Sequence, residues 1–273
     1  PSPTTGERVG MSFIMPRTID DLVKRRQMMK VWADATCGMM GRTPDFLNVS
    51  IMGFAAHRDF FAQCQPQFGD NIWRYYEYIR EHDLCLTHTL VPPQIDRSKA
   101  ASQQADPYLV LGVVRETSDG VIVRGARMLA TLAPYADELA VYPSTFRGFQ
   151  GDEQRYAMMF AIPIATPGLT FICREGFDLN RPEWDHPLGS RFDEMDCVAI
   201  FDNVLVPWER VFLYNNVELY NRTFAATKHL SYVGHQVAVK NIAKTEFVLG
   251  VACLLAETIG IKEFLHVQEK LGE

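Results

Sequence analysis

The sequence lacks the marks of membrane, secreted and nucleic-acid-binding proteins. No apolar run approaches the ~20 residues of a membrane span, and no secretory signal pattern opens the chain. The formal net charge of -6 and the scattered basic residues argue against a surface for nucleic acid. The six cysteines stand far apart without a CxxC pair, which is typical of free thiols in a reducing compartment. We therefore expect a cytoplasmic protein that binds small molecules.

Motifs for nucleotide and hydrolase chemistry are also missing. No GxGxxG follows a strand pattern and no P-loop is present, so any dinucleotide must be held in another way. The absence of GxSxG and HExxH weakens a hydrolase interpretation. We expect no metal site, because the six histidines other than His88 lack metal-ligand spacing and are interpreted as surface or core residues. These are His57, His82, His186, His229, His235 and His266.

The periodicity of apolar residues divides the chain into three regions. Residues 1–83 show helical spacing and predict helices at about 18–35, 43–61 and 70–82. Residues 84–210 switch to a period of two, which predicts mixed, mostly antiparallel strands in a β-sandwich or barrel. Residues 211–273 return to helix, with a long apolar face over 229–265. Such a face is expected to pack in a bundle and between subunits, so we expect an oligomer.

The first helix carries its own prediction about the core. Thr18 is expected to cap it, with acidic residues in the first turn. Its apolar residues begin with Ile19 and Leu22 and continue to Met29 and Trp32, and they predict the stripe that faces the core.

One histidine stands inside an apolar strand pattern that ends abruptly. Leu86, His88 and Leu90 fall on one side of the period-two pattern, so His88 lies on the more apolar face. Pro92 and Pro93 lack backbone donors and cannot continue a ladder, so a polar loop begins there. A titratable ring at such a strand end marks a candidate site. A core histidine with one hydrogen bond explains the same pattern, because buried polar groups are usually satisfied.

Four stretches carry a family resemblance. They are residues 40–45 (MGRTPD), 87–97 (THTLVPPQIDR), 125–131 (GARMLAT) and 187–193 (PLGSRFD), the last followed by 201–209 (FDNVLVPWE). In sequence and order they resemble the oxygenase component of two-component flavin monooxygenases, the family typified by 4-hydroxyphenylacetate 3-monooxygenase. The resemblance runs from about Thr18 to the end of the chain. Members of that family are longer at both ends, so the chain is expected to be a fragment.

The resemblance implies both a fold and a reaction. The fold is α+β and acyl-CoA-dehydrogenase-like, with N-terminal helices (1–83), a central β-domain (84–210) and the start of a C-terminal helical bundle (211–273). The reaction is hydroxylation of a phenol such as 4-hydroxyphenylacetate by O2 and reduced FAD (FADH2), which a separate NAD(P)H-dependent flavin reductase delivers. The missing nucleotide-binding fingerprint agrees with this division of labour. The oligomer is expected to be a homotetramer.

The resemblance also implies residues that act on the substrate. His88 and Arg42 are the implied catalytic pair, because an imidazole promotes deprotonation of a phenol and a guanidinium stabilises phenolate charge. The implied substrate-binding set adds Phe46, Ser144 and Thr145 to this pair. By itself, an arginine in the position of Arg42 is more often a solvated or salt-bridged residue that follows a helix.

A second set of residues is implied to line the flavin. It consists of the loop after the His88 strand and one hydroxyl further along: Gln94, Ile95, Asp96, Arg97 and Thr131. Thr131 is implied to donate a hydrogen bond near the reactive nitrogen of the flavin. The alternative for Thr131 is a β-branched residue that favours the strand conformation.

One departure from the family pattern leaves the substrate open. The 4-hydroxyphenylacetate enzymes typically carry tyrosine at the position of Phe46, so this chain lacks one hydroxyl for the substrate and a chlorophenol becomes plausible. A lyase like 4-hydroxybutyryl-CoA dehydratase shares the fold, but it needs cysteines and a histidine around an iron–sulfur cluster. Cys37 has no partner at suitable spacing for that role. A non-catalytic assembly protein of the same fold is the third alternative.

Overall fold

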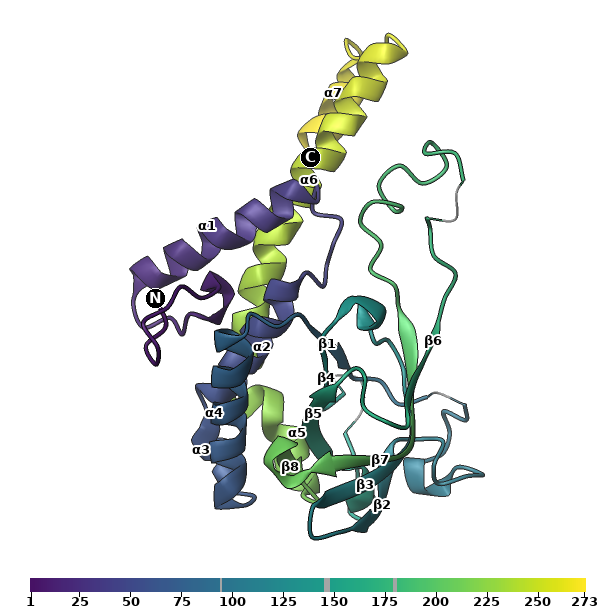
Figure 1. Cartoon of the computed structure of the whole chain (residues 1–273). Coiled ribbons are helices and arrows are strands. Elements are labelled where there is room, and N and C mark those ends of the chain that lie inside the picture. Colours follow the sequence, from purple (N-terminus) through teal and green to yellow (C-terminus); the bar gives the residue numbers. More distant parts are fainter. Residues whose placement is uncertain (94, 145–147, 179–180) are drawn as a thin grey trace.

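The computed structural model describes residues 1–93, 95–144, 148–178 and 181–273. In these residues, four α-helices come first, followed by eight strands and then three more α-helices (Figure 1). The helices are α1 (Ile19–Ala35), α2 (Pro44–Ala55), α3 (Arg58–Ala62), α4 (Pro66–Glu81), α5 (Val217–Ala226), α6 (His229–Thr258) and α7 (Leu265–Gly272). The strands are β1 (Leu86–Thr89), β2 (Gly112–Glu116), β3 (Gly120–Arg127), β4 (Glu138–Val141), β5 (Met158–Pro163), β6 (Leu169–Cys173), β7 (Cys197–Pro207) and β8 (Val211–Tyr214).

The strands form two four-stranded sheets, in the orders β1-β4-β5-β8 and β2-β3-β7-β6. The sheets meet through buried rings, and Phe160 on β5 packs edge to face with Phe201 on β7 at 6.1 Å between ring centroids. All strand pairs are antiparallel except β1 with β4, which run parallel. The predicted α+β class and the mostly antiparallel β region are confirmed. The parallel pair brings the carboxyl ends of β1 and β4 to one edge of their sheet.

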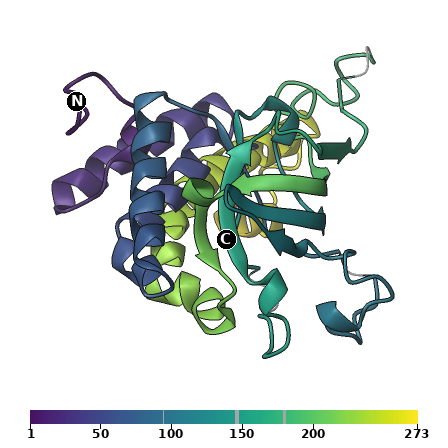
Figure 2. The same ribbon diagram turned by 60° about the horizontal axis from the view of Figure 1, so that its bottom comes forward.

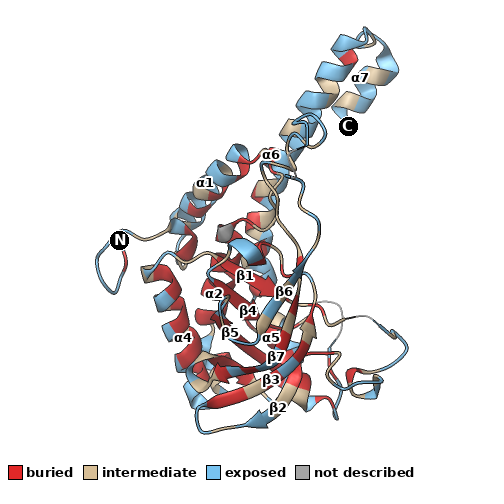
Figure 3. Ribbon diagram, turned by 45° about the vertical axis from the view of Figure 1, so that its right-hand side comes forward, coloured by how far each residue is buried: buried red, intermediate tan, exposed pale blue. Residues whose placement is uncertain are grey.

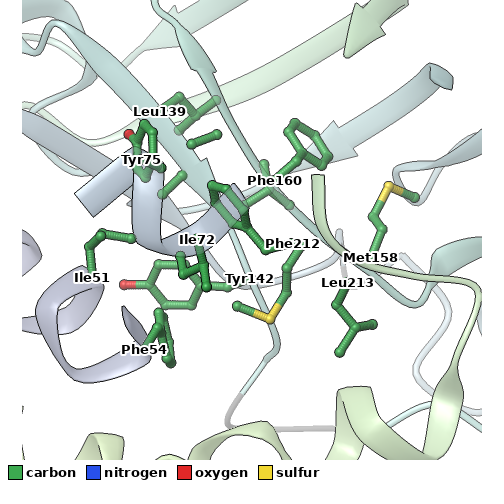
Figure 4. Packing of buried hydrophobic residues seen from close by; sticks show 14 of the residues in the cluster. Ile51, Phe54, Ile72, Tyr75, Leu139, Tyr142, Met158, Phe160, Phe212 and Leu213 are labelled. Atoms are coloured by element: carbon green, nitrogen blue, oxygen red, sulfur yellow. The ribbon is translucent and has the colours of Figure 1, made fainter. Parts of the chain in front are cut away.

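Of the N-terminal helices, α2 and α4 cover the outer face of the sheet that contains β1 (Figure 2). α2 contributes Ile51 and Phe54 to this interface, and α4 contributes Ile72 and Tyr75 (Figure 4). The Phe54 ring meets the Tyr142 ring edge to face at 5.4 Å. Burial of aromatic and aliphatic side chains on this scale is the main stabilising contribution to such an interface. The helix–sheet junction is therefore a packed core.

The first helix matches its predicted bounds, but its predicted apolar stripe was wrong except at Met29. Thr18 caps α1 in a capping box with Asp21. Ile19 is 81% exposed, and Leu22, Val23 and Trp32 are also exposed. The buried face is instead Arg25, Met29 and Ala33. These residues lie on the side that α6 packs against, so the position of α6 outweighs the apolar pattern of α1.

Two other helix predictions had incorrect bounds. The helix predicted over 43–61 is split, because the chain leaves the helical conformation at His57 and restarts as α3. The helix predicted from residue 70 already begins at Pro66, since proline is well suited to the first helical position, where no donor is needed. β8 also pairs with β5, so this sheet continues four residues past position 210. The division of the chain into three domains stays a prediction.

The long apolar helix is only partly covered. Near its start, α6 packs against α1 and α2, and Val233, Val239 and Ala243 are buried. Towards its end α6 leaves the body of the molecule together with α7, and its apolar side chains are exposed (Figures 1 and 3). Leu254 and Leu255, for example, are 63% and 59% exposed. Within the described residues, no helix combines the length and the apolar character needed to cross a bilayer.

Candidate functional site

β1 directs His88 and its two threonine neighbours to opposite sides. The whole strand is buried, and His88 lies opposite Ala140 of β4 in parallel register. The hydroxyls of Thr87 and Thr89 donate to backbone carbonyls on one side, and the Thr89 bond to Met128 is 2.8 Å long. His88 points to the other side, towards α2, where its ring lies 6.0 Å from the Phe46 ring. The predicted alternation along this strand is confirmed.

Arg42 lies in the connection between α1 and α2. Its backbone N–H donates to the Glu194 carboxylate, which holds this connection against the segment before β7. The guanidinium lies 4.4 Å above the centroid of the Phe46 ring, within the range of a cation–π contact. In the described part of the chain, no carboxylate forms an ion pair with the Arg42 guanidinium. This cation is therefore available to an anionic or polar ligand.

Arg42, Phe46 and His88 line one cavity of about 320 Å³, which we call the inner cavity. Its volume falls at the lower end of the roughly 300–1,000 Å³ of small-molecule sites. Most of its wall is apolar or aromatic, with side chains from α5 and α6 and from the end of β1. These include Leu90, Phe224, Leu230, Val233 and Val237. The structure thus brings the two predicted catalytic residues and Phe46 around one space that suits a single aromatic ring.

His88 is neutral in this environment. Burial, together with the neighbouring Arg42 and His229, lowers the pKa of His88 to about 3. Its Nδ1 is enclosed and has no hydrogen-bond partner within the described residues. A neutral imidazole with a free ring nitrogen is able to exchange a proton with a bound hydroxyl.

Two further residues of the inner cavity were missed by sequence reasoning. Tyr142 stacks on His88 at 5.5 Å with 19° between the ring planes. Burial raises the pKa of Tyr142 above its usual range, so its hydroxyl stays protonated. His229, interpreted from the sequence as a surface or core residue, lines the cavity, and its Nε2 lies 2.7 Å from the Ser50 hydroxyl. Burial lowers the pKa of His229 to about 4. The only sequence signal for Tyr142 was its place at a strand end before proline.

Two more cavities, which we call the outer cavities, begin where the chain leaves β1. Pro93 borders both of them. One has a volume of about 220 Å³ and is lined by residues that include Asp96, Arg97 and Ser144. The other has a volume of about 560 Å³, and its lining residues include Ile95, Tyr108, Arg124, Met128 and Val198.

The outer cavities combine apolar walls with guanidinium groups. Arg124 lies 5.4 Å from the centroid of the Tyr108 ring, and Arg97 is exposed at the other cavity. Flat apolar surfaces suit an aromatic ring system, and guanidinium groups bind phosphate through paired donors. The residues present therefore fit a cofactor such as FAD, with one aromatic part and one anionic part.

The remaining predicted residues are placed as follows. Gln94 and Thr145 lie outside the described residues. Ser144 lines an outer cavity and does not appear among the residues around the inner one. The Thr131 hydroxyl donates to Asp196 at 2.6 Å, and Thr131 borders neither the inner nor the outer cavities. The roles of Thr131 and Ser144 stay predictions.

Comparison with protein families covers almost the whole chain. Residues 1–213 match the family described as 4-hydroxyphenylacetate 3-hydroxylase N terminal. Residues 220–273 match the family described as 4-hydroxyphenylacetate 3-hydroxylase C terminal.

Individual relatives show the same similarity. The 4-hydroxyphenylacetate 3-monooxygenase oxygenase component of Geobacillus sp. (strain PA-9) is 52% identical over 272 residues, which cover 100% of this chain and 55% of the relative. The corresponding component of Thermus thermophilus is 51% identical over 268 residues, covering 98% and 54%. The chain thus spans about half the length of these curated relatives.

Solved structures extend the comparison to the fold. A crystal structure of the oxygenase component of 4-hydroxyphenylacetate 3-monooxygenase, complexed with FAD and 4-hydroxyphenylacetate, matches with a TM-score of 0.91 and 50% identity, over 98% of this chain and 55% of that one. Butyryl-CoA dehydrogenase from Megasphaera elsdenii matches with a TM-score of 0.57 and 16% identity, over 92% and 58%. An archaeal 4-hydroxybutyryl-CoA dehydratase from N. maritimus matches with 0.83 and 19%, over 98% and 53%. The last two show the fold alone, and they confirm the predicted acyl-CoA-dehydrogenase-like architecture.

Proposed function

This chain belongs to the 4-hydroxyphenylacetate 3-hydroxylase family, and we propose that it is the substrate- and flavin-binding part of an FADH2-dependent phenol monooxygenase. The observation that carries the proposal is the inner cavity. It places a neutral imidazole and a guanidinium without a carboxylate partner, among the described residues, around a space for one aromatic ring. The relatives named oxygenase component support the same function.

His88 and Arg42 act on the hydroxyl of the bound phenol. The low pKa of His88 keeps the imidazole neutral at neutral pH, so its unpaired Nδ1 can accept a hydrogen bond from the phenol hydroxyl. Arg42 is always charged and stabilises the negative charge that develops on the phenol oxygen. A deprotonated ring carries more electron density and is a better target for an electrophilic oxygen. The Phe46 ring orients the Arg42 guanidinium through the cation–π contact between them.

The outer cavities hold the flavin in this proposal. Reduced FAD, when bound, supplies the electrons that activate O2 for insertion into the phenol ring. Arg97 and Arg124 bind its phosphates, and the apolar side chains around Pro93 pack against its ring system. Pro93 follows shortly after His88 in the sequence, so the substrate-binding and flavin-binding regions adjoin along one short stretch of chain. Ser144, which follows β4, and Thr145 contribute in this proposal to substrate binding and to the exclusion of water.

The substrate is a phenol such as 4-hydroxyphenylacetate. The solved relative that contains this compound supports the choice. Phe46 provides no hydroxyl, so the contact with the substrate at this position is apolar, and a chlorophenol remains the alternative substrate. The dehydratase shares only the fold at 19% identity, so the lyase alternative has weaker support than the hydroxylase.

The complete enzyme works with partners. A separate flavin reductase delivers reduced FAD in this proposal, and the lack of a dinucleotide-binding fingerprint in this sequence agrees with that division of labour. The exposed apolar side chains at the end of α6 are covered in a homotetramer and by the rest of the helical bundle. The protein acts in the cytoplasm.

One reconstitution tests the proposed function. The full-length protein is mixed anaerobically with reduced FAD, and oxygen is then added with 4-hydroxyphenylacetate, with a chlorophenol or without a phenol. The expected result is a hydroxylated product in at least one phenol arm and hydrogen peroxide alone in the arm without phenol. Peroxide without hydroxylated product in every arm would overturn the proposal.

A further inference from the structure

Two of the six cysteines face each other at the edge of a sheet. All six are free, and the Cys197 thiol donates to the Cys173 sulfur at 3.3 Å. Cys173 ends β6 and Cys197 begins β7, and the two are direct partners in the antiparallel register. Sequence spacing did not predict this pair, because 23 positions separate the two cysteines, from 174 to 196.

The backbone at this pair has the geometry that a disulfide needs. The Arg174 N–H donates to the Asp196 carbonyl at 3.2 Å, which makes those neighbours a hydrogen-bonded pair. Both backbone groups of Cys197 bond to Ala130 instead. Cys173 and Cys197 therefore form a non-hydrogen-bonded pair, in which Cα atoms are about 4.5 Å apart. Disulfides span about 4.4–6.8 Å between Cα atoms, so the strands need no rearrangement.

We propose that Cys173 and Cys197 form an oxidation site at which hydrogen peroxide converts the two thiols into a disulfide. The two thiols differ in access, since Cys173 is exposed and Cys197 is 3% exposed. Burial, together with the hydrogen bond to Cys173, raises the pKa of Cys197 to about 12. Cys173 is therefore the sulfur that meets the oxidant, and Cys197 is the sulfur that resolves the product.

The reaction balances in two steps. In the first, the Cys173 sulfur attacks peroxide, the O–O bond breaks, and a sulfenic acid and one water form. In the second, the Cys197 sulfur attacks the Cys173 sulfur, the S–O bond breaks, and the hydroxyl leaves as water with the Cys197 proton. Two thiols and one hydrogen peroxide thus become one disulfide and two waters.

The site is connected to the inner cavity. The disulfide would join the two ends of the segment 174–196, whose Glu194 accepts the backbone N–H of Arg42. Reduced flavin and O2 yield hydrogen peroxide whenever no phenol is oxidised, so the enzyme would produce the oxidant itself. That source rests on the proposed function, whereas the oxidation site rests on the geometry of the two thiols.

Peptide mapping after addition of hydrogen peroxide tests the site without flavin or phenol. The full-length protein is treated with graded peroxide, alkylated and digested without reductant. The expected result is a linked peptide pair that contains Cys173 and Cys197, has lost two hydrogen atoms and separates on addition of a dithiol. Thermal unfolding of the oxidised protein is expected at a higher temperature than that of the reduced protein, because the link constrains the unfolded chain.

Two variants and one control complete the experiment. Cys173→Ser is expected to abolish the linked peptide, and Cys197→Ser is expected to leave a Cys173 sulfenic acid that dimedone traps. Cys64→Ser is the matched control, since the Cys64 thiol donates to the Tyr214 carbonyl away from the pair, and it should leave the link intact. Oxidation of Cys173 beyond the sulfenic acid without any linked peptide, or no reaction at either cysteine, would overturn the proposal.

Discussion

The inner and outer cavities differ in how they are built and in what they offer a ligand. The inner cavity lies at the junction of helices and sheet. Its polar side chains are two neutral histidines, the protonated hydroxyl of Tyr142 and the Arg42 guanidinium. The outer cavities lie where loops leave β1, and they carry charged side chains such as Asp96, Arg97 and Arg124. The inner cavity is formed by core packing, whereas the outer cavities depend on the loop that contains residues 95–97.

This difference agrees with the proposed function, in which the inner cavity binds the phenol and the outer cavities bind the flavin. A low-dielectric cavity strengthens each electrostatic interaction with a buried hydroxyl, so a few fixed groups are sufficient for chemistry. A cavity at the surface with charges suits the binding of an anionic cofactor that arrives from solution. Substitutions in one region should therefore leave the function of the other largely intact, and this independence can be tested.

His88→Gln should have the largest effect and should be confined to the inner cavity. The amide lacks a basic nitrogen, so the rate of phenol hydroxylation should fall by up to about 10²–10⁴-fold, the usual contribution of a general base, and the product yield should fall with it. Affinity for reduced FAD should change little, as measured by anaerobic fluorescence titration. His82→Gln is the control, because His82 is exposed at the end of α4. An unchanged product yield in His88→Gln would remove this residue from the mechanism.

The pH dependence of stability should report the buried imidazoles of the inner cavity. The folded-state pKa values of His88 and His229, about 3 and about 4, lie below the usual 6.5. Below pH 6.5 the unfolded chain therefore binds protons that the folded chain does not. The free energy of unfolding should be highest above pH 6.5 and should fall with decreasing pH, by up to about 1.4 kcal/mol per pH unit for each histidine.

Denaturant unfolding between pH 7 and about 4.5 measures this slope. His229→Gln should reduce the slope by the share of one histidine, and His82→Gln should leave it unchanged. Equal slopes in the parent and His229→Gln would contradict the buried, neutral state of His229.

Arg97→Gln should weaken flavin binding at the outer cavities and leave phenol binding at the inner cavity unchanged. Loss of one charge-assisted hydrogen bond, worth about 1.5–3 kcal/mol, should weaken binding of reduced FAD by roughly tenfold or more. Phenol affinity at the inner cavity should stay at the parent value, as measured by calorimetry. Arg191→Gln is a control at an exposed arginine whose partner is Glu183. Weaker phenol binding with unchanged flavin binding would reverse the assignment of the two regions.

Phe46→Tyr should have the smallest effect. The added hydroxyl offers the phenol one hydrogen bond of about 0.5–1.5 kcal/mol, so affinity for 4-hydroxyphenylacetate should rise by a few-fold. Affinity for a phenol that lacks a partner for this hydroxyl should not rise. A decrease for every phenol tested would show that the position needs an apolar ring.

The His88 strand shows what sequence patterns can predict. A strand has only two faces, so period-two alternation correctly placed His88 on the side opposite Thr87 and Thr89. The convergence of Arg42 with His88 was different, because three helices separate them and no spacing rule relates positions so far apart. It was predicted only from the family resemblance.

The missed residues depend on tertiary pairing. Tyr142 reaches the inner cavity because β4 runs parallel to β1, which a mostly antiparallel expectation does not predict. His229 reaches it because the start of α6 lies against α2, where its ring stacks 4.8 Å from Phe54. Most of the apolar stripe predicted for the core face of α1 is exposed for the same reason. The apolar pattern of one helix does not specify which neighbour will cover it.

Ionisation of a bound nitrophenol tests most directly whether His88 and Arg42 act on one hydroxyl. The nitrophenolate has its own visible absorption band, so its protonation state is measured in the full-length protein by titration with pH. We predict that the bound phenol ionises at lower pH than the free phenol, and that His88→Gln and Arg42→Gln each move this transition back towards the free value. A bound phenol that titrates identically in the parent and both variants would contradict the account.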